Sequence, residues 1–202
     1  MLPDEAAELL DFWFGPLPDA GSLDPVRAAH WFLDGRAWDT PIRTRFGALI
    51  ERAARGELDD WPASPRGRLA LILLLDQCPR HVYRATAAAF ASDRLAQAQA
   101  LTGIVRGDDL ALHPVERLFH YLPLEHAEDA VLQAASVAAF TRLHAETPPA
   151  LQQQSAGWLD YAERHRAVIE RFGRFPDLNA LLGRQTTAAE QDFLAGPGSS
   201  FL

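Results

Sequence analysis

The chain has 202 residues, of which 48% are hydrophobic and 23% are charged, as in a globular protein with a sizeable core. The formal net charge of −8 argues against sequence-independent binding of nucleic acid, which needs a basic face. All 19 basic residues are arginine and one residue is cysteine, which excludes a lysine Schiff base, a phosphate-loop lysine, an intrachain disulfide and a multi-cysteine metal site.

Prolines and capping residues divide the first half of the chain into predicted helices. The first, over 4–14, is acidic and amphipathic and lacks the basic region and cleavage site of a signal peptide. Because no apolar run approaches the roughly 18 residues that span a bilayer, we expect a cytoplasmic protein without a membrane partner. Further helices are predicted over 25–32, 41–55 and 65–77. The last is apolar on every side from Leu69 to Leu75, which is typical of a central, buried helix.

The second half of the chain continues the helical pattern. Predicted helices cover 90–105, 114–121, 125–146 and 150–172, and a capping box of Thr187 and Glu190 begins a last one. No segment alternates polar and apolar residues with the period of a strand. We therefore predict one all-α domain over residues 1–202, with about eight to ten helices stacked as hairpins.

Polar residues end the most apolar helix. Asp76, Gln77 and Arg80 directly follow the leucine run. A carboxylate near a helix C-terminus is disfavoured by the helix dipole by about 0.3–1 kcal/mol, and burial adds to this cost, so we expect Asp76 to be paired with an arginine. Two interpretations stay open: a structural Asp–Arg pair that locks two helices, or a pocket whose ligand these side chains contact.

The stretch ERLFHYLPLEHAED, residues 116–129, concentrates acids, histidines and a tyrosine. Its candidate site residues are Tyr121, Glu125, His126 and Glu128. Carboxylates and imidazoles in such proximity transfer protons or bind divalent metals, but the stretch lacks the His-Glu-x-x-His and Glu-x-x-His spacings of known metal sites. The alternatives are acids that stabilise a helix N-terminus, a proton-transfer or polar-binding site, and a metal site.

Residues 163–179 end a long helix in a cationic cluster. His165 lies on a predicted helix face, and Arg171, Arg174 and Asn179 gather where the helix stops. Cations at this position complement the helix dipole, which is one interpretation. The other is a patch that recognises a carboxylate or phosphate group.

Motifs over nearly the whole chain resemble the bacterial domain-of-unknown-function 924 family, which is placed among tetratricopeptide-like folds. The resemblance runs from LLDFWFGP (9–16) to PGSSF (197–201) and includes GELDDW (56–61), RGRLALILLLDQCPR (66–80), AFASD (89–93), ERLFHYLPLEHAED (116–129) and HRAVIERFGRFPDLNALLGR (165–184). It implies a fold of tetratricopeptide-like stacked helical hairpins and no established reaction.

This chain departs from the family pattern at two places. Cys78 and His81 stand where the family has phenylalanine and asparagine, and Asp177 and Leu178 stand where it has histidine and arginine. The packing at the first place and the positive charge at the second are therefore expected to differ from those of the family.

We hypothesise that the three polar motifs converge on one pocket. Glu125, His126 and His165 are the candidates for proton transfer, because histidine titrates near neutral pH. The candidate ligand contacts are Asp76, Gln77, Arg80, Tyr121, Glu128, Arg171, Arg174 and Asn179, among which the arginines would hold an anionic group. The protein would then bind, and in the stronger form of the hypothesis transform, a small anionic molecule without a cofactor or a bound metal.

Two alternatives stay open beside this hypothesis. A tetratricopeptide-like scaffold would bind a protein or peptide in a concave groove and use the three motifs as internal staples. A metal-dependent hydrolase would require a stoichiometric metal. The sequence does not decide whether the protein is an enzyme, which substrate it takes or how it assembles.

Overall fold

The computed structural model describes residues 2–17, 24–32 and 35–197. Within these ranges every regular element is a helix, which confirms the predicted all-α fold class. The first half contains α1 (Asp4–Phe14), α2 (Pro25–Phe32), α3 (Arg36–Ala54), α4 (Pro65–Ile72) and α5 (Cys78–Val82). The second half contains α6 (Asp93–Arg106), α7 (Pro114–Glu125), α8 (Ala130–Glu146), α9 (Gln152–Phe172) and α10 (Ala188–Leu194). None of the described helices combines the length and apolar character that crossing a membrane requires.

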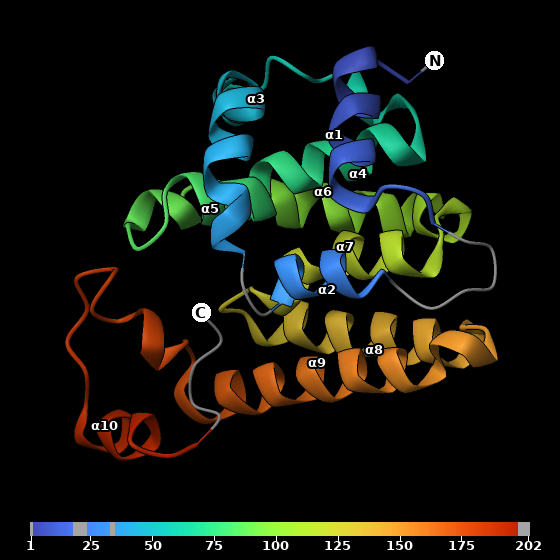
Figure 1. Cartoon of the computed structure of the whole chain (residues 1–202). Coiled ribbons are helices and arrows are strands. Elements are labelled where there is room, and N and C mark those ends of the chain that lie inside the picture. Colours follow the sequence, from blue (N-terminus) through green and yellow to red (C-terminus); the bar gives the residue numbers. More distant parts are fainter. Residues whose placement is uncertain (1, 18–23, 33–34, 198–202) are drawn as a thin grey trace.

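The helices are arranged in layers (Figure 1). α1 and α3 stand on one side of a middle layer that contains α4, α5, α6 and α7, and α8 and α9 run along the opposite side. α9 packs most extensively against α8, and α8 packs next most extensively against α7. Consecutive helices thus contact one another, as in stacked hairpins; the tetratricopeptide-like label stays a prediction. The chain after α9 forms a small lobe with α10 beside the end of that helix.

Aromatic side chains fill the core between the N-terminal helices and α7. The rings of Trp13 and Phe14 lie 5.6 and 5.4 Å from the ring of Phe119, centre to centre. Trp13 also meets Trp38 of α3 at 5.3 Å. All four side chains are buried, and each contributes on the order of 2–3 kcal/mol through the apolar surface that it removes from water. This core packs against the middle layer, which carries the first two polar motifs.

The most apolar helix does not end at residue 77 as predicted. A π-helical turn, η2 (Leu73–Gln77), follows α4 without a break and continues into α5, so the chain is helical from 65 to 82. Pro79 is the physical reason, since it has no N–H and its ring would clash with a carbonyl one turn earlier in a regular α-helix. The wider turn, in which the N–H of Cys78 donates to the carbonyl of Leu73, accommodates the proline. Asp76 therefore lies inside a continuous helical run.

The end of α7 also differs from the prediction. Pro123 predicts an end at 121, but the helix continues through it to Glu125. Every residue of α7 from Val115 onward is buried, and this packing outweighs the roughly 3 kcal/mol that proline costs inside a helix. Glu125 therefore ends α7, and its interpretation as an acid at the start of the next helix is wrong. Asp129 takes that role, because its carboxylate accepts two backbone N–H groups of the first turn of α8.

Other helix starts also shift. α8 begins at 130 and not 125, and α9 begins at 152 and not 150, after a 3₁₀ turn. α3 begins at 36 and not 41, and α6 begins at 93 and not 90, because a 3₁₀ turn, η3 (Ala87–Phe90), precedes it. The predicted capping box is present: the Thr187 hydroxyl accepts the N–H of Glu190, whose carboxylate accepts the N–H of Thr187. The last motif of the family resemblance, from 198 onward, lies outside the described residues.

Candidate functional site

The π-turn places the side chain of Asp76 in the protein interior, where none of it is exposed. Its Oδ2 accepts a hydrogen bond from the amide of Gln77 at 2.5 Å. Its Oδ1 lies 3.5 Å from a guanidinium nitrogen of Arg80, one turn later on α5. The Asp–Arg pair expected from the sequence is present, but the shorter contact of this carboxylate comes from another helix.

His126, directly after α7, holds the carboxylate of Asp76 through Nδ1, which lies 2.8 Å from Oδ1. Burial alone would raise the pKa of Asp76, but the charge and hydrogen bond of His126, together with the charge of Arg80, hold it at about 2. Burial opposes protonation of His126, yet the charge and hydrogen bond of Asp76 raise the pKa of the imidazole above its usual value. The ionised carboxylate of Asp76 therefore favours the protonated form of the His126 ring.

The second ring nitrogen of His126 reaches solvent. No residue in the described part of the chain bonds to Nε2, and this nitrogen is not among the buried atoms that lack a partner. The side chain is 24% exposed, in contrast to the fully buried Asp76. Since Nδ1 is occupied by the carboxylate, Nε2 is the nitrogen that can exchange a proton with a molecule from solvent.

Glu125 and His165 lie next to this pair, and both side chains are buried. Burial raises the pKa of Glu125 to about 7. The charge of His126 lowers this pKa, but it offsets only part of the effect of burial. Burial lowers the pKa of His165 to about 3, although its Nδ1 lies 2.8 Å from the carbonyl of Tyr161. The same nitrogen is 3.4 Å from Oε1 of Glu125, but this contact is not an ion pair at neutral pH, because the imidazole is neutral there.

The structure thus brings residues of all three motifs together. The rings of His126 and His165 lie 6.4 Å apart, centre to centre. We term the assembled group the polar cluster; its members are Asp76, Gln77, Arg80, Glu125, His126 and His165. It lies where η2 and α5 meet the turn between α7 and α8 and the last part of α9, at the left of the molecule in Figure 1.

Arg80 is bound within the protein on several sides. A guanidinium nitrogen lies 2.9 Å from Oδ2 of Asp93, another donates to the carbonyl of Ala89, and the guanidinium lies 4.2 Å from the centre of the Phe90 ring. Burial raises the pKa of Asp93, and the charge of Arg80 opposes that effect. Sequence reasoning assigned no role to Asp93; the signal that could have found it is the AFASD motif, 89–93, which ends on this acid.

Tyr121 lies on the same helix as Glu125, but its hydroxyl belongs to a different network. The hydroxyl donates to Oδ2 of Asp109 at 2.5 Å and accepts from Arg117 and Arg142 at 3.3 and 3.2 Å. These bonds join the 3₁₀ turn after α6 to α7 and α8. The structure therefore does not bring the Tyr121 hydroxyl to the polar cluster.

Glu128 connects the body of the protein to the segment after α9. Its carboxylate accepts bonds from Arg184 at 2.6 Å and from the N–H of Phe175 at 2.7 Å. The ring of Phe175 in turn lies 5.5 Å from that of His165, centre to centre. Glu128 thus supports one wall of the polar cluster without entering it.

The last three candidates lie in the C-terminal lobe or at the end of α9 beside it. Arg174 and Asn179 both bond to the carboxylate of Glu190, at 2.7 and 3.3 Å. Arg171 is exposed, and its guanidinium lies 4.7 Å from the centre of the Phe172 ring. The geometry therefore separates these residues from His126, and their role as contacts of a ligand stays a prediction.

Of the four residues that depart from the family pattern, Cys78 and His81 are buried, and Asp177 and Leu178 are partly exposed. Cys78 is fully buried, and burial raises the pKa of its thiol far above the usual range, so it packs as a small apolar side chain. His81 pairs through Nδ1 with Oδ1 of Asp39 on α3 at 2.8 Å. In the part of the chain that the structure describes, no group of three or more His, Cys, Asp and Glu side chains is arranged to hold a metal ion.

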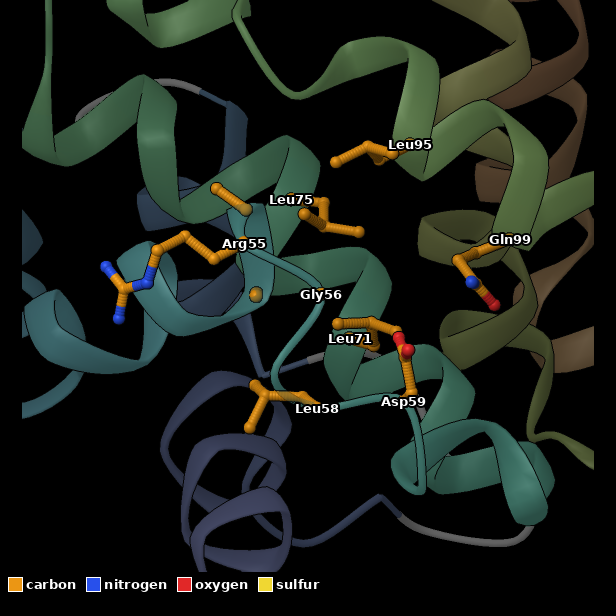
Figure 2. A pocket seen from close by; sticks show the side chains of 10 residues that line it. Arg55, Gly56, Leu58, Asp59, Leu71, Leu75, Leu95 and Gln99 are labelled. Atoms are coloured by element: carbon orange, nitrogen blue, oxygen red, sulfur yellow. The ribbon is translucent and has the colours of Figure 1, made fainter.

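A surface cavity of about 250 Å³ lies away from the polar cluster (Figure 2). It is bordered by the end of α3, the turn that follows it, the run of α4 and η2, and the start of α6. Leu75 lines this cavity, whereas its neighbour Asp76 bonds to His126. The polar cluster itself meets solvent at the surface of His126 and Arg80, which are 24% and 22% exposed.

Comparisons with known proteins cover nearly the whole chain. The model of a family described as "Bacterial protein of unknown function (DUF924)" matches residues 9–198. A solved structure, the protein of unknown function ATU0120 from Agrobacterium tumefaciens, has a TM-score of 0.78 and 38% identity, and the match covers 94% of this chain and 96% of that one. No curated protein sequence matches. Neither description states a ligand or a reaction.

Proposed function

The chain belongs to the bacterial DUF924 family, and from its polar cluster we propose that it binds a small anionic molecule at His126 and exchanges a proton with it. One observation carries the proposal: a fully buried carboxylate holds Nδ1 of an imidazole whose Nε2 reaches solvent. A carboxylate in this position fixes the orientation of the ring and stabilises its protonated form, as general acid–base catalysis requires.

The candidate anion site is the Nε2 donor of His126 rather than a net positive charge, because Asp76 and Asp93 offset the charges of Arg80 and His126. Arg80 is engaged by Asp76 and Asp93, so its charge is balanced within the protein. His126 is the member of the cluster that combines a raised pKa with a solvent-reaching donor. Affinity for an anion should therefore be highest below the pKa of His126 and should fall as the pH rises through it, because the imidazolium is then lost.

Glu125 provides a second proton site beside His126. With a pKa of about 7, its carboxyl is roughly half protonated at neutral pH. A group that titrates near the working pH is suited to take up or return a proton. The neutral ring of His165 adds no positive charge that would keep Glu125 ionised.

The proposal is tested by following the histidine ring signals in NMR while acetate, succinate or inorganic phosphate is added. At least one of these anions should shift the His126 signals with saturation, and His126→Gln should weaken its binding about tenfold or more. Asp76→Asn should lower the pKa of His126, because it removes the charge that raises it, and should move the loss of binding to lower pH. Arg106→Gln, which removes an exposed cation at the far end of α6, is the matched control.

Two results would contradict the proposal. The first is that none of the three anions shifts the His126 signals. The second is that His126→Gln binds these anions as well as the wild type does. A scaffold that uses the cluster as an internal staple predicts a different pattern: His126→Gln and Asp76→Asn both lower thermal stability, and neither removes a ligand.

A further inference from the structure

The cavity beside α6 has an apolar floor and wall (Figure 2). Leu71 and Leu75, one turn apart on the α4–η2 run, form the floor and are 4% and 2% exposed. Leu95 of α6 forms a wall and leaves 46% of its surface exposed. A volume of about 250 Å³ lies just below the range of roughly 300–1,000 Å³ typical of drug-sized ligands, so it suits one ring or a short aliphatic chain.

Asp59 and Gln99 supply the polar edge of this cavity; Figure 2 shows Asp59 beside Leu71 and Gln99 on a separate helix. The Oε1 of Gln99 accepts a bond from Arg68 at 2.6 Å, which holds the amide in place with its NH₂ group as the remaining donor. Asp59 is exposed, and none of the residues that the structure describes bonds to its carboxylate. An acceptor with a full negative charge therefore stands next to an apolar surface.

The segment 51–60, which borders the cavity on one side, is negative, whereas Arg68 at the other side is paired with Asp108. Residues 51–60 contain four acids and two arginines, a formal charge of 2 − 4 = −2. Both arginines are paired, Arg52 with Glu5 at 3.1 Å and Arg55 with Glu57 at 2.6 Å, and Figure 2 shows the guanidinium of Arg55 directed away from the leucines. The local charge thus complements a cation, and the net charge of −8 of the whole chain adds to the attraction.

We propose that this cavity binds a small amine that combines an apolar body of about one ring with a single ammonium group. The body packs mainly on Leu95, with the small exposed parts of Leu71 and Leu75 below it, and the ammonium group pairs with Asp59. Because an exposed ion pair contributes at most about 1 kcal/mol, the charge should favour the amine over a neutral analogue by about fivefold, and apolar contact should supply the rest of the affinity. This site is independent of the polar cluster.

The test titrates the full chain with 2-phenylethylammonium, 2-phenylethanol and 3-phenylpropionate and follows the backbone amide signals in NMR. The amine should bind best, the alcohol about fivefold more weakly and the acid most weakly. Asp59→Asn should make the amine and the alcohol bind alike. Asp60→Asn, which removes the adjacent exposed acid outside the cavity lining, should leave the preference intact.

The apolar part of the site is tested with a second pair of variants on α6. Leu95→Ser should weaken both the amine and the alcohol severalfold, whereas Val105→Ser, at a position that is 86% exposed on the same helix, should weaken neither. The proposal is overturned if the wild type binds the amine and the alcohol equally, or if Asp60→Asn abolishes the preference as fully as Asp59→Asn. It is also overturned if the shifted amides lie outside the cavity lining or the shifts do not saturate.

Discussion

Asp76 and Glu125 are two buried carboxyl groups in one cluster, and their pKa values shift in opposite directions. Burial raises the pKa of each, but Asp76 accepts a bond from His126 and lies near Arg80, and its pKa falls to about 2. Among the residues that the structure describes, none gives Glu125 such a charged hydrogen-bond donor, and its pKa rises to about 7. The side-chain types are nearly the same, so the difference arises from the partners that the fold supplies.

Glu125→Gln should reveal the cost of this burial as a pH-dependent change in stability. Between pH 4.5 and 7 the unfolded chain loses the Glu125 proton while the folded chain keeps it, so the contribution of this group to stability falls as the pH rises, by about 3 kcal/mol in total. Relative to the wild type, the variant should therefore gain about 3 kcal/mol in free energy of unfolding over that range. Urea unfolding at several pH values measures the difference.

A matched variant separates this effect from a general change of charge. Glu163→Gln alters an exposed glutamate on α9 and should show no comparable trend with pH. A difference between Glu125→Gln and the wild type that stays constant from pH 4.5 to 7 would show that Glu125 is ionised in the folded protein.

At the scale of elements, α6 and α7 approach closely because residue 103 has no side chain. A Cβ at Gly103 would lie 2.3 Å from Cε1 of His120, whose ring is fully buried. The Nε2 of this ring contacts the carbonyl of Ala100 at 3.1 Å, and burial lowers the pKa of the imidazole to about 4, so it is neutral at physiological pH. The ring has no room to move aside without losing that contact.

Gly103→Ala should destabilise the protein even though alanine is the better helix former. The gain in helix propensity is roughly 1 kcal/mol, and overpacking a buried contact costs about 1–3 kcal/mol, so we expect a net loss. Gly157→Ala is the control, because a Cβ at this position of α9 meets nothing within 4 Å and should add up to about 1 kcal/mol of stability. Chemical unfolding of both variants checks the predicted opposite signs; equal effects would contradict the close packing.

At the scale of the whole molecule, polar contacts of Glu128 join the C-terminal lobe to the helical body. Glu128, in the turn before α8, accepts hydrogen bonds from the guanidinium of Arg184 and the backbone N–H of Phe175. A separate apolar group, which includes Val168, Ile169 and Phe175, packs the lobe on the end of α9. The lobe thus depends on one acidic residue for much of its polar attachment.

Glu128→Gln should loosen this lobe while the body stays intact. Amide hydrogen exchange should increase across 173–194, because the charged partner of Arg184 is lost, and should change little in α4 and α7. Glu170→Gln removes an exposed acid from α9 and serves as the control. An increase in exchange spread evenly over the chain would indicate global destabilisation and contradict the local role.

Local chemistry explains which parts of the fold were predictable. The helices over 4–14 and 25–32, the Thr187 capping box and the buried Leu69–Leu75 run all follow from periodicity and from bonds between residues a few positions apart. The errors that bear on the polar cluster lie at two prolines. A π-turn accommodates Pro79, and the burial of α7 stabilises the helix through Pro123. Both outcomes depend on packing against helices that are distant in the sequence.

The sequence by itself determined an all-α chain, the family to which it belongs and the side-chain types available for chemistry. The tertiary structure alone decided that Asp76 meets His126, 50 positions away, that Arg80 is engaged by Asp93, and that Tyr121, Arg171 and Arg174 point to other networks. The physical reason is range: caps and helix periodicity act over about one turn, whereas ion pairing, burial and the pKa shifts that follow depend on which helix surfaces are brought together.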